Sequence, residues 1–178
     1  PYGVTSVGSK AFSGCTSLTV LTIPGTISVG SSVFENSKIR TLKIANGSKT
    51  VKKTAIISKD TLETVVIPSS VQSIAADSFA GCTALTALTI PGELNSISET
   101  EFEDCELKTL VIADGSTVVA PVSVRCKDTL QRVTVPDTVK WIREGALSDC
   151  AGISEITVPD SVTSIGKNAF LNCTGLRT

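Results

Sequence analysis

The sequence contains no histidine, no methionine and few aromatic residues. The absence of histidine excludes His-ligated zinc sites, Ser-His-Asp triads and Cys-His pairs. Five Phe, one Tyr and one Trp are the only aromatic residues among 178, so side chains for base stacking or binding hot spots are scarce. The absence of even a first methionine indicates an excised or processed piece of a longer protein.

Strong charge of either sign and long apolar runs are also absent. The chain has 16 Lys and Arg against 17 Asp and Glu, a balance that attracts neither nucleic acid nor an anionic membrane. No apolar run approaches the ~20 residues of a membrane-spanning helix, and there is no signal peptide. Val, Ile, Leu and Thr are abundant instead, and these residues favour β-strands in a chain long enough for one domain with a sizeable core.

A repeat of 22 or 23 residues runs through the chain. Its most visible row is mostly phenylalanine and comprises Phe12, Phe34, Ile56, Phe79, Phe102, Val124, Leu147 and Phe170. An aliphatic residue stands five positions before each, and a Leu-x-x-Leu-x-Ile segment follows in the same register. One copy is too small to bury its own apolar face, so the copies must stack into a solenoid.

The Leu-x-x-Leu-x-Ile segment has the alternation of a short β-strand. Because neighbouring strands lie ~4.8 Å apart, the stacked copies predict one parallel sheet along the coil. In five copies a proline, which has no N–H for the ladder, follows this segment. These prolines are Pro24, Pro68, Pro91, Pro136 and Pro159.

A second period of 67 or 68 residues is superimposed on the first, and it indicates that three repeats were duplicated as a unit. Residues 58–68, for example, match residues 126–136. In most copies the Gly-x-x-Ala-Phe segment is expected to form a short helical or 3₁₀ turn. Residues 54–57 and 122–124 in the third and sixth copies are expected to be extended, since Pro121 disfavours a helix.

The pattern IPxSVxxIGxxAFxxCxxLxxLxIP is clearest in residues 67–91 and 158–176. It resembles the BspA-type leucine-rich repeat, and the resemblance covers the whole chain except that the third and sixth copies lack the Phe and the in-register Cys. The resemblance implies a surface or secreted protein of the kind found in anaerobic bacteria and some parasitic protists. It also implies adhesion to host matrix proteins or to other cells, without catalytic residues.

The expected fold is therefore an α/β-type leucine-rich repeat solenoid. It is a right-handed coil of about eight 22–23-residue repeats with a parallel β-sheet on its concave face. Short helical, 3₁₀ or extended segments are expected on the convex face. Residues 1–178 form one domain, interpreted as a fragment without its caps, which leaves a monomer or a weak association through the solenoid ends.

Most cysteines share one position, three residues after the phenylalanine row. They are Cys15, Cys82, Cys105, Cys150 and Cys173, while Cys126 is one residue out of register. Ser37 and Lys59 fill the position in two copies, so the row is not a metal cluster. Disulfides between Cys82 and Cys105 or between Cys150 and Cys173 remain open because stacked coils bring equivalent Cα atoms ~4.8 Å apart. Packing as a small hydrophobic residue is the favoured interpretation.

The outward positions of the predicted strands form the candidate binding face, because the concave sheet of a solenoid commonly binds its ligand. The candidate residues are Thr22, Thr41, Lys43, Thr64, Val66, Thr89, Thr109, Val111, Arg132, Thr134, Glu155 and Thr157. Thr and Val also suit any solvated strand, and Arg132 and Glu155 on neighbouring coils are placed to pair with each other.

Trp141 is a second candidate because the other copies have Ser, Thr or Val at its position. An exposed Trp is a frequent binding anchor. The alternative is that its ring covers a gap between coils beside Arg143.

The sequence thus favours a non-enzymatic protein-binding or adhesion module of a cell-surface or secreted protein. A host matrix or cell-surface protein is the partner that the resemblance implies; no cofactor, metal, nucleic acid or membrane insertion is expected. The alternatives are a structural spacer that presents another domain and, less favoured, a glycan-binding module.

Overall fold

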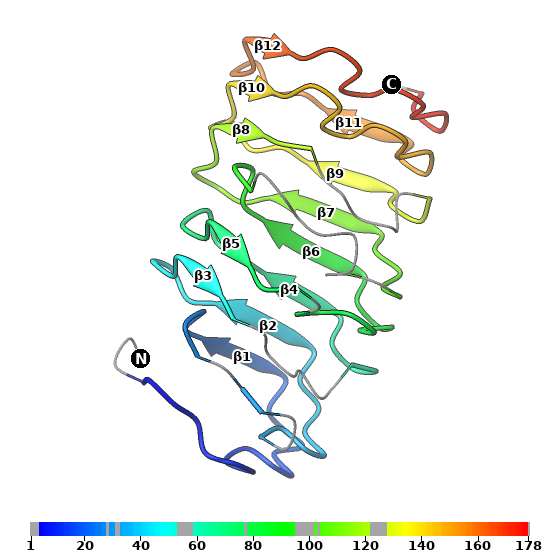
Figure 1. Cartoon of the computed structure of the whole chain (residues 1–178). Coiled ribbons are helices and arrows are strands. Elements are labelled where there is room, and N and C mark those ends of the chain that lie inside the picture. Colours follow the sequence, from blue (N-terminus) through cyan, green and yellow to red (C-terminus); the bar gives the residue numbers. More distant parts are fainter. Residues whose placement is uncertain are drawn as a thin grey trace.

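The computed structural model describes residues 4–27, 29–30, 33–52, 59–76, 78–94, 102, 104–121 and 128–177. The chain winds as a solenoid in which equivalent segments of successive repeats stack, from β1 near one end to β11 and β12 near the other (Figure 1). The predicted solenoid is confirmed.

One parallel sheet of seven strands runs along the coil in the order β1-β2-β4-β6-β7-β9-β11. Its strands are β1 (Val20–Ile23), β2 (Thr41–Ile44), β4 (Thr64–Val66), β6 (Ala87–Ile90), β7 (Thr109–Ile112), β9 (Arg132–Thr134) and β11 (Glu155–Thr157). Each strand is the Leu-x-x-Leu-x-Ile segment of one copy, and the copies pair without a register shift, as Leu88 pairs with Leu110. Seven strands rather than eight occur because the eighth copy of the printed sequence stops before this segment.

The sheet buries one face because its strands alternate. Leu42, Val65, Leu88, Leu110 and Val133 point inward, and each is at most 4% exposed. Their neighbours on either side are exposed or half-buried. Two pairs of phenylalanines extend the core: the rings of Phe12 and Phe34 stack, as do those of Phe79 and Phe102. Successive coils therefore contact one another through the same rows that the sequence shows.

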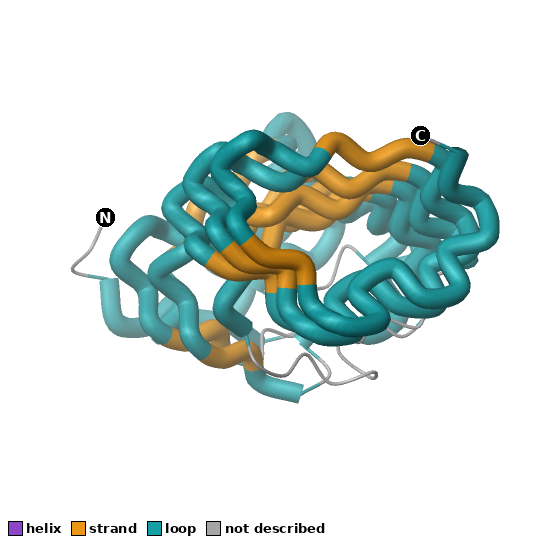
Figure 2. Tube along the Cα trace, turned by 90° about the horizontal axis from the view of Figure 1, so that it is seen from above, coloured by secondary structure: helices purple, strands orange, loops and turns teal. Residues whose placement is uncertain are grey.

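A second line of strands, which the sequence did not predict, runs beside the first (Figures 1 and 2). Its members have two residues each: β3 (Thr50–Val51), β5 (Ser73–Ile74), β8 (Val118–Val119), β10 (Trp141–Ile142) and β12 (Ser164–Ile165). They form two separate parallel sheets, β3-β5 and β12-β10-β8. The aliphatic member of β3, β5, β8 and β10 is buried, so these short strands close the core on another side.

Two glycines 67 residues apart lie directly beside the coils of β3 and β8. The N–H of Gly25 donates to Ser48 Oγ at 3.0 Å, and its carbonyl accepts the N–H of Lys52 at 2.9 Å. Gly92 makes the corresponding bonds with Ser116 Oγ and Ala120 N–H, at 3.0 and 2.8 Å. At both positions the backbone of one coil lies directly against the next coil.

The segments around the phenylalanine row differ from the sequence-based expectation. The described residues form turns here rather than helices, for example over residues 8–14 and 144–149 (Figure 2). The turns are held by bonds between coils, such as Gly14 N–H to the Glu35 carbonyl at 2.7 Å. Asn and Asp residues with positive φ support them, as does Asp149 at 62°. The expectation of extended backbone at residues 54–57 and 122–124 falls outside the described residues.

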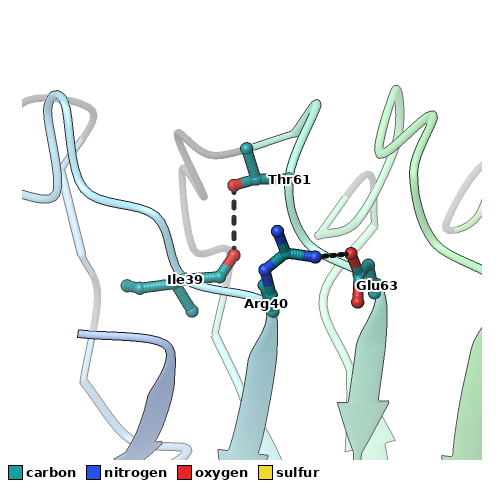
Figure 3. A network of polar contacts seen from close by, with 4 residues as sticks. All are labelled: Ile39, Arg40, Thr61 and Glu63. Atoms are coloured by element: carbon teal, nitrogen blue, oxygen red, sulfur yellow. Dashed lines mark hydrogen bonds and ion pairs between the residues drawn. The ribbon is translucent and has the colours of Figure 1, made fainter. Parts of the chain in front are cut away.

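Serine and threonine side chains join one coil to the preceding one. Thr61 Oγ1 donates to the carbonyl of Ile39 at 3.1 Å, and Thr129 Oγ1 repeats this with Leu107 at 2.9 Å. An ion pair between Arg40 and Glu63 lies beside the first of these bonds (Figure 3). The abundance of hydroxyl side chains therefore has a structural cause, since each such bond satisfies a main-chain group between stacked coils.

Candidate functional site

The outward face of the seven-stranded sheet holds all twelve predicted binding residues, and none of them is buried. Six are exposed and six are half-buried. Because their strands pair without a register shift, the side chains stand in two straight rows, such as Thr109 beside Arg132 and Glu155.

Five of the predicted residues line a hollow of about 470 Å³ on this face. They are Thr109, Arg132, Thr134, Glu155 and Thr157, and Lys108, Gln131 and Ser154 complete its polar rim. Three coils contribute to the hollow, so it exists only in the stacked solenoid.

The charged groups of this hollow do not neutralise one another. Arg132 and Glu155 are register partners on β9 and β11, yet the structure has no ion pair between them. The sequence-based interpretation that they pair is therefore wrong. Lys108, on the coil before Arg132, also has no carboxylate partner among the described residues. Two cationic groups and one anionic group are available to a ligand.

Three more predicted residues line a second hollow of about 480 Å³ at the carboxyl ends of the middle strands. Val66, Thr89 and Val111 form its floor along the sheet, next to the turn residues Asn46 and Asp114. The remaining predicted residues are Thr22, Thr41, Lys43 and Thr64, and they line neither hollow. The structure thus brings the candidates of the middle and C-terminal coils together.

Trp141 lies on a different surface, in the middle strand of the sheet β12-β10-β8. Its side chain is 51% exposed, whereas Val118 beside it in β8 is only 5% exposed. Trp141 lines a hollow of about 430 Å³ together with Glu93, Thr117 and Arg143. Glu93 was not predicted as its neighbour, because it lies two coils away; its only sequence signal is that the copies ending in Ile-Pro or Val-Pro otherwise have Ser or Thr at its position.

The cysteine row lies mostly inside the solenoid. Cys82, Cys105 and Cys150 are buried, Cys173 is half-buried and Cys15 is exposed. These five described cysteines form no disulfides, and Cys126 falls outside the described residues. Cys173 Sγ donates to the carbonyl of Leu147 at 3.1 Å, and Cys105 Sγ contacts the carbonyl of Phe79 in the same way at 3.6 Å. The row therefore contributes weak hydrogen bonds between coils, which a purely apolar interpretation missed.

Burial raises the pKa of Cys82 from 9.0 to about 11, against a lowering by the nearby Lys59 ammonium. The unfolded thiol ionises first as the pH rises, so the stability from this buried thiol is complete below pH 9 and is lost towards pH 11. A buried thiol that stays protonated is a poor nucleophile, which favours a structural role for Cys82.

The described residues also lack two further features. In that part of the chain, no cluster of three or more Cys, Asp or Glu side chains is suited to hold a metal ion. Nor does any helix there have the length and apolarity needed to cross a membrane.

The repeat pattern of this chain also occurs in a known protein family. The profile of the BspA type leucine rich repeat region, which comprises six copies, matches residues 1–57 and 50–177. The chain belongs to this leucine-rich repeat family. No curated protein matches the chain.

Solved structures of similar fold come from bacteria. A leucine-rich repeat protein from Eubacterium ventriosum has a TM-score of 0.56 and 25% identity over 86% of this chain and 42% of its own. A leucine rich cell surface protein from Faecalibacterium prausnitzii has a TM-score of 0.47 and 26% identity over 90% of this chain and 46% of its own. The chain thus spans less than half the length of these proteins.

Proposed function

We propose that this solenoid is a non-enzymatic protein-binding module of a cell-surface or secreted protein. The observation that carries the proposal is the outward face of the seven-stranded sheet, with unpaired Lys108, Arg132 and Glu155 around a 470 Å³ hollow. A partner with complementary charges would pair with these groups, and complementary charge gives an interface its specificity and association rate.

The dimensions of the face suit a protein partner. Seven strands at a spacing of ~4.8 Å extend over ~29 Å, and the second hollow continues the surface towards the middle coils. The main chain beneath is fixed by the ladder, so binding would require little ordering of the receptor. Host matrix or cell-surface proteins are the partners that membership of the family suggests.

The test is binding of the purified chain to a panel of immobilised extracellular matrix proteins and host-cell surface proteins. The variant Arg132→Ala/Glu155→Ala should bind the recognised protein at least about tenfold more weakly, which corresponds to about 1.4 kcal/mol. Lys167→Ala, in an exposed turn away from the sheet, is the matched control and should bind normally.

Two results would overturn the proposal. Unchanged binding by the double variant would place the contact surface elsewhere. An absence of binding across the panel would favour the alternative, a structural spacer that presents another domain.

A further inference from the structure

The surface around Trp141 has a different chemistry from the face of the large sheet. One half-exposed aromatic ring stands in a hollow of about 430 Å³ among carboxylate, guanidinium and hydroxyl groups. These groups come from Glu93, Arg143, Thr117 and Ser164. A concave site with an apolar surface and a few convergent polar groups is the usual form of a small-ligand site.

The main chain holds Trp141 in place from both sides. Its strand β10 pairs with Val118 of β8 on one side and with Ser164 of β12 on the other. The Thr117 carbonyl accepts the N–H of Trp141 at 3.3 Å and that of Lys140 at 2.7 Å. The ring therefore projects from the middle of a small sheet rather than from a loose loop.

Thr117 also positions the carboxylate of Glu93. Its Oε1 accepts hydrogen bonds from the N–H and from the hydroxyl of Thr117, which leaves Oε2 for a ligand. The indole N–H of Trp141 and the hydroxyl of Ser164 have no hydrogen-bond partner within the described part of the chain. The site thus offers one fixed acceptor, one free donor and one free hydroxyl around an aromatic face.

Gly166 borders the hollow and lets the end of β12 lie close against the preceding coil. A Cβ added there would lie 2.4 Å from the Glu144 nitrogen, so a larger residue does not fit without movement of the backbone. The corresponding position on the preceding coil is Arg143, whose long side chain lines the hollow. The close approach of the two coils therefore fixes this edge of the hollow.

We infer that this hollow is a binding site for a single pyranose ring of a carbohydrate. A sugar ring has an apolar C–H face, which stacks on an aromatic ring, and hydroxyls at its edge, which both donate and accept hydrogen bonds. The Trp141 ring and the groups of Glu93 and Ser164 supply the partners for both surfaces. A volume of about 430 Å³ lies in the range of small-ligand sites, whereas a stable protein interface needs about 800 Å² on each partner.

The test uses Trp141 itself as the reporter, since it is the only tryptophan in the chain. The 178-residue protein is titrated with the methyl glycosides of glucose, galactose, mannose and N-acetylglucosamine, and emission and acrylamide quenching are recorded. At least one glycoside should shift the emission and protect the indole saturably, with a Kd on the order of 1 mM.

Variants separate this site from the sheet face. Glu93→Ala keeps the reporter and should weaken sugar binding at least about fivefold, or about 1 kcal/mol, whereas Arg132→Ala on the large sheet should bind the sugar normally. Trp141→Ser should abolish binding measured by calorimetry while the circular dichroism spectrum is kept.

The inference is overturned if none of the four glycosides protects Trp141 in the folded protein, or if Glu93→Ala binds the sugar as tightly as the parent. Loss of a protein partner in Trp141→Ser, without any response to sugars, would likewise overturn it and would make Trp141 a protein contact. Since this test reads free glycosides, its outcome does not depend on the function proposed for the large sheet.

Discussion

The seven-stranded sheet and the line of two-residue strands are made by the same coils, but within the described part of the chain they differ in continuity. Each coil adds one strand to the large sheet, and the order β1-β2-β4-β6-β7-β9-β11 has no gap. The described short strands form two groups, β3-β5 and β8-β10-β12, and at one edge of each group Gly25 or Gly92 lies directly against the coil that carries β3 or β8. A strand of three or four residues therefore recurs in each of the seven coils of the large sheet, and the five middle strands have a buried Leu or Val, whereas the two-residue strands depend on their local neighbours.

The two regions are stabilised by different kinds of interaction. The large sheet depends on rows of interchangeable aliphatic side chains, because Leu42, Val65 and Val133 occupy equivalent positions. The contacts of Gly25 and Gly92 depend instead on individual groups: a glycine without a Cβ, and a serine hydroxyl that accepts the glycine N–H. Substitutions on the two sides should thus differ in what they tolerate.

The largest effect is expected for Leu88→Ala in β6, at the centre of the large sheet. Leu88 is 1% exposed, and the cavity should lower the free energy of unfolding by about 3–4 kcal/mol in urea denaturation. Leu88→Met is the conservative control and should cost less than about 1.5 kcal/mol. Leu21→Ala in the same row should cost less than Leu88→Ala, because Leu21 is only half-buried in the edge strand β1. Equal losses at the two positions would contradict the row-based account.

Gly92→Ala should cost about 3 kcal/mol, because a Cβ would lie 1.9 Å from the carbonyl oxygen of Val118 and neither backbone can move freely. Gly8→Ala is the matched control, since no atom lies within 4 Å of its added Cβ. The control should be neutral or slightly stabilising when both variants are compared by thermal melting. If Gly92→Ala were as stable as the parent, the close approach of Gly92 to β8 would not require a glycine.

Ser116→Ala should cost about 1–2 kcal/mol. Ser116 is fully buried, and the variant leaves the Gly92 N–H without its acceptor at 3.0 Å. Ser73→Ala, in the exposed position of β5, should change the free energy of unfolding very little. Amide hydrogen exchange at Gly92 gives a second measurement: faster exchange in Ser116→Ala is expected, and unchanged protection would show that another group holds this N–H.

The smallest effect is expected for Arg40→Ala at the start of β2. The Arg40–Glu63 ion pair joins two strands of the large sheet, but both side chains are about half exposed. Exposed pairs contribute less than about 0.5 kcal/mol and are screened by salt. Equal urea midpoints of parent and variant at high salt are expected; a loss that persists there would indicate a packing role for the Arg40 side chain.

The large sheet was predictable because the same apolar positions recur at a fixed spacing from copy to copy, which indicates both the strands and their register. Leu88 and Leu110 could be paired from the sequence alone, and the outward position of Thr109, Arg132 and Glu155 followed from the alternation. The second line was missed because two residues such as Ser73 and Ile74 have no alternation to detect. A Ser or Thr before the aliphatic residue in six of the eight copies was the one available signal.

The sites were predictable only in part, since hollows arise where rows from different coils end or change. Arg132 was correctly placed on the outward face, but its lack of a carboxylate partner depends on side-chain directions that no pattern encodes. Trp141 stood out as an exception to its row. Its neighbour Glu93 was missed, because Thr117 bonds to both the Glu93 carboxylate and the Trp141 N–H and so brings residues of three coils together.

The coil-to-coil hydrogen bonds described above span about one repeat, as from Thr129 to Leu107 or from Thr138 to Ser116. A force applied to the two ends of such a stack would act on the coils in series, and the outermost coil would detach before its neighbours. Each detached coil of 22 or 23 residues would lengthen the chain by ~70 Å. The solenoid would thus behave as an extensible tether whose length increases in steps of one repeat.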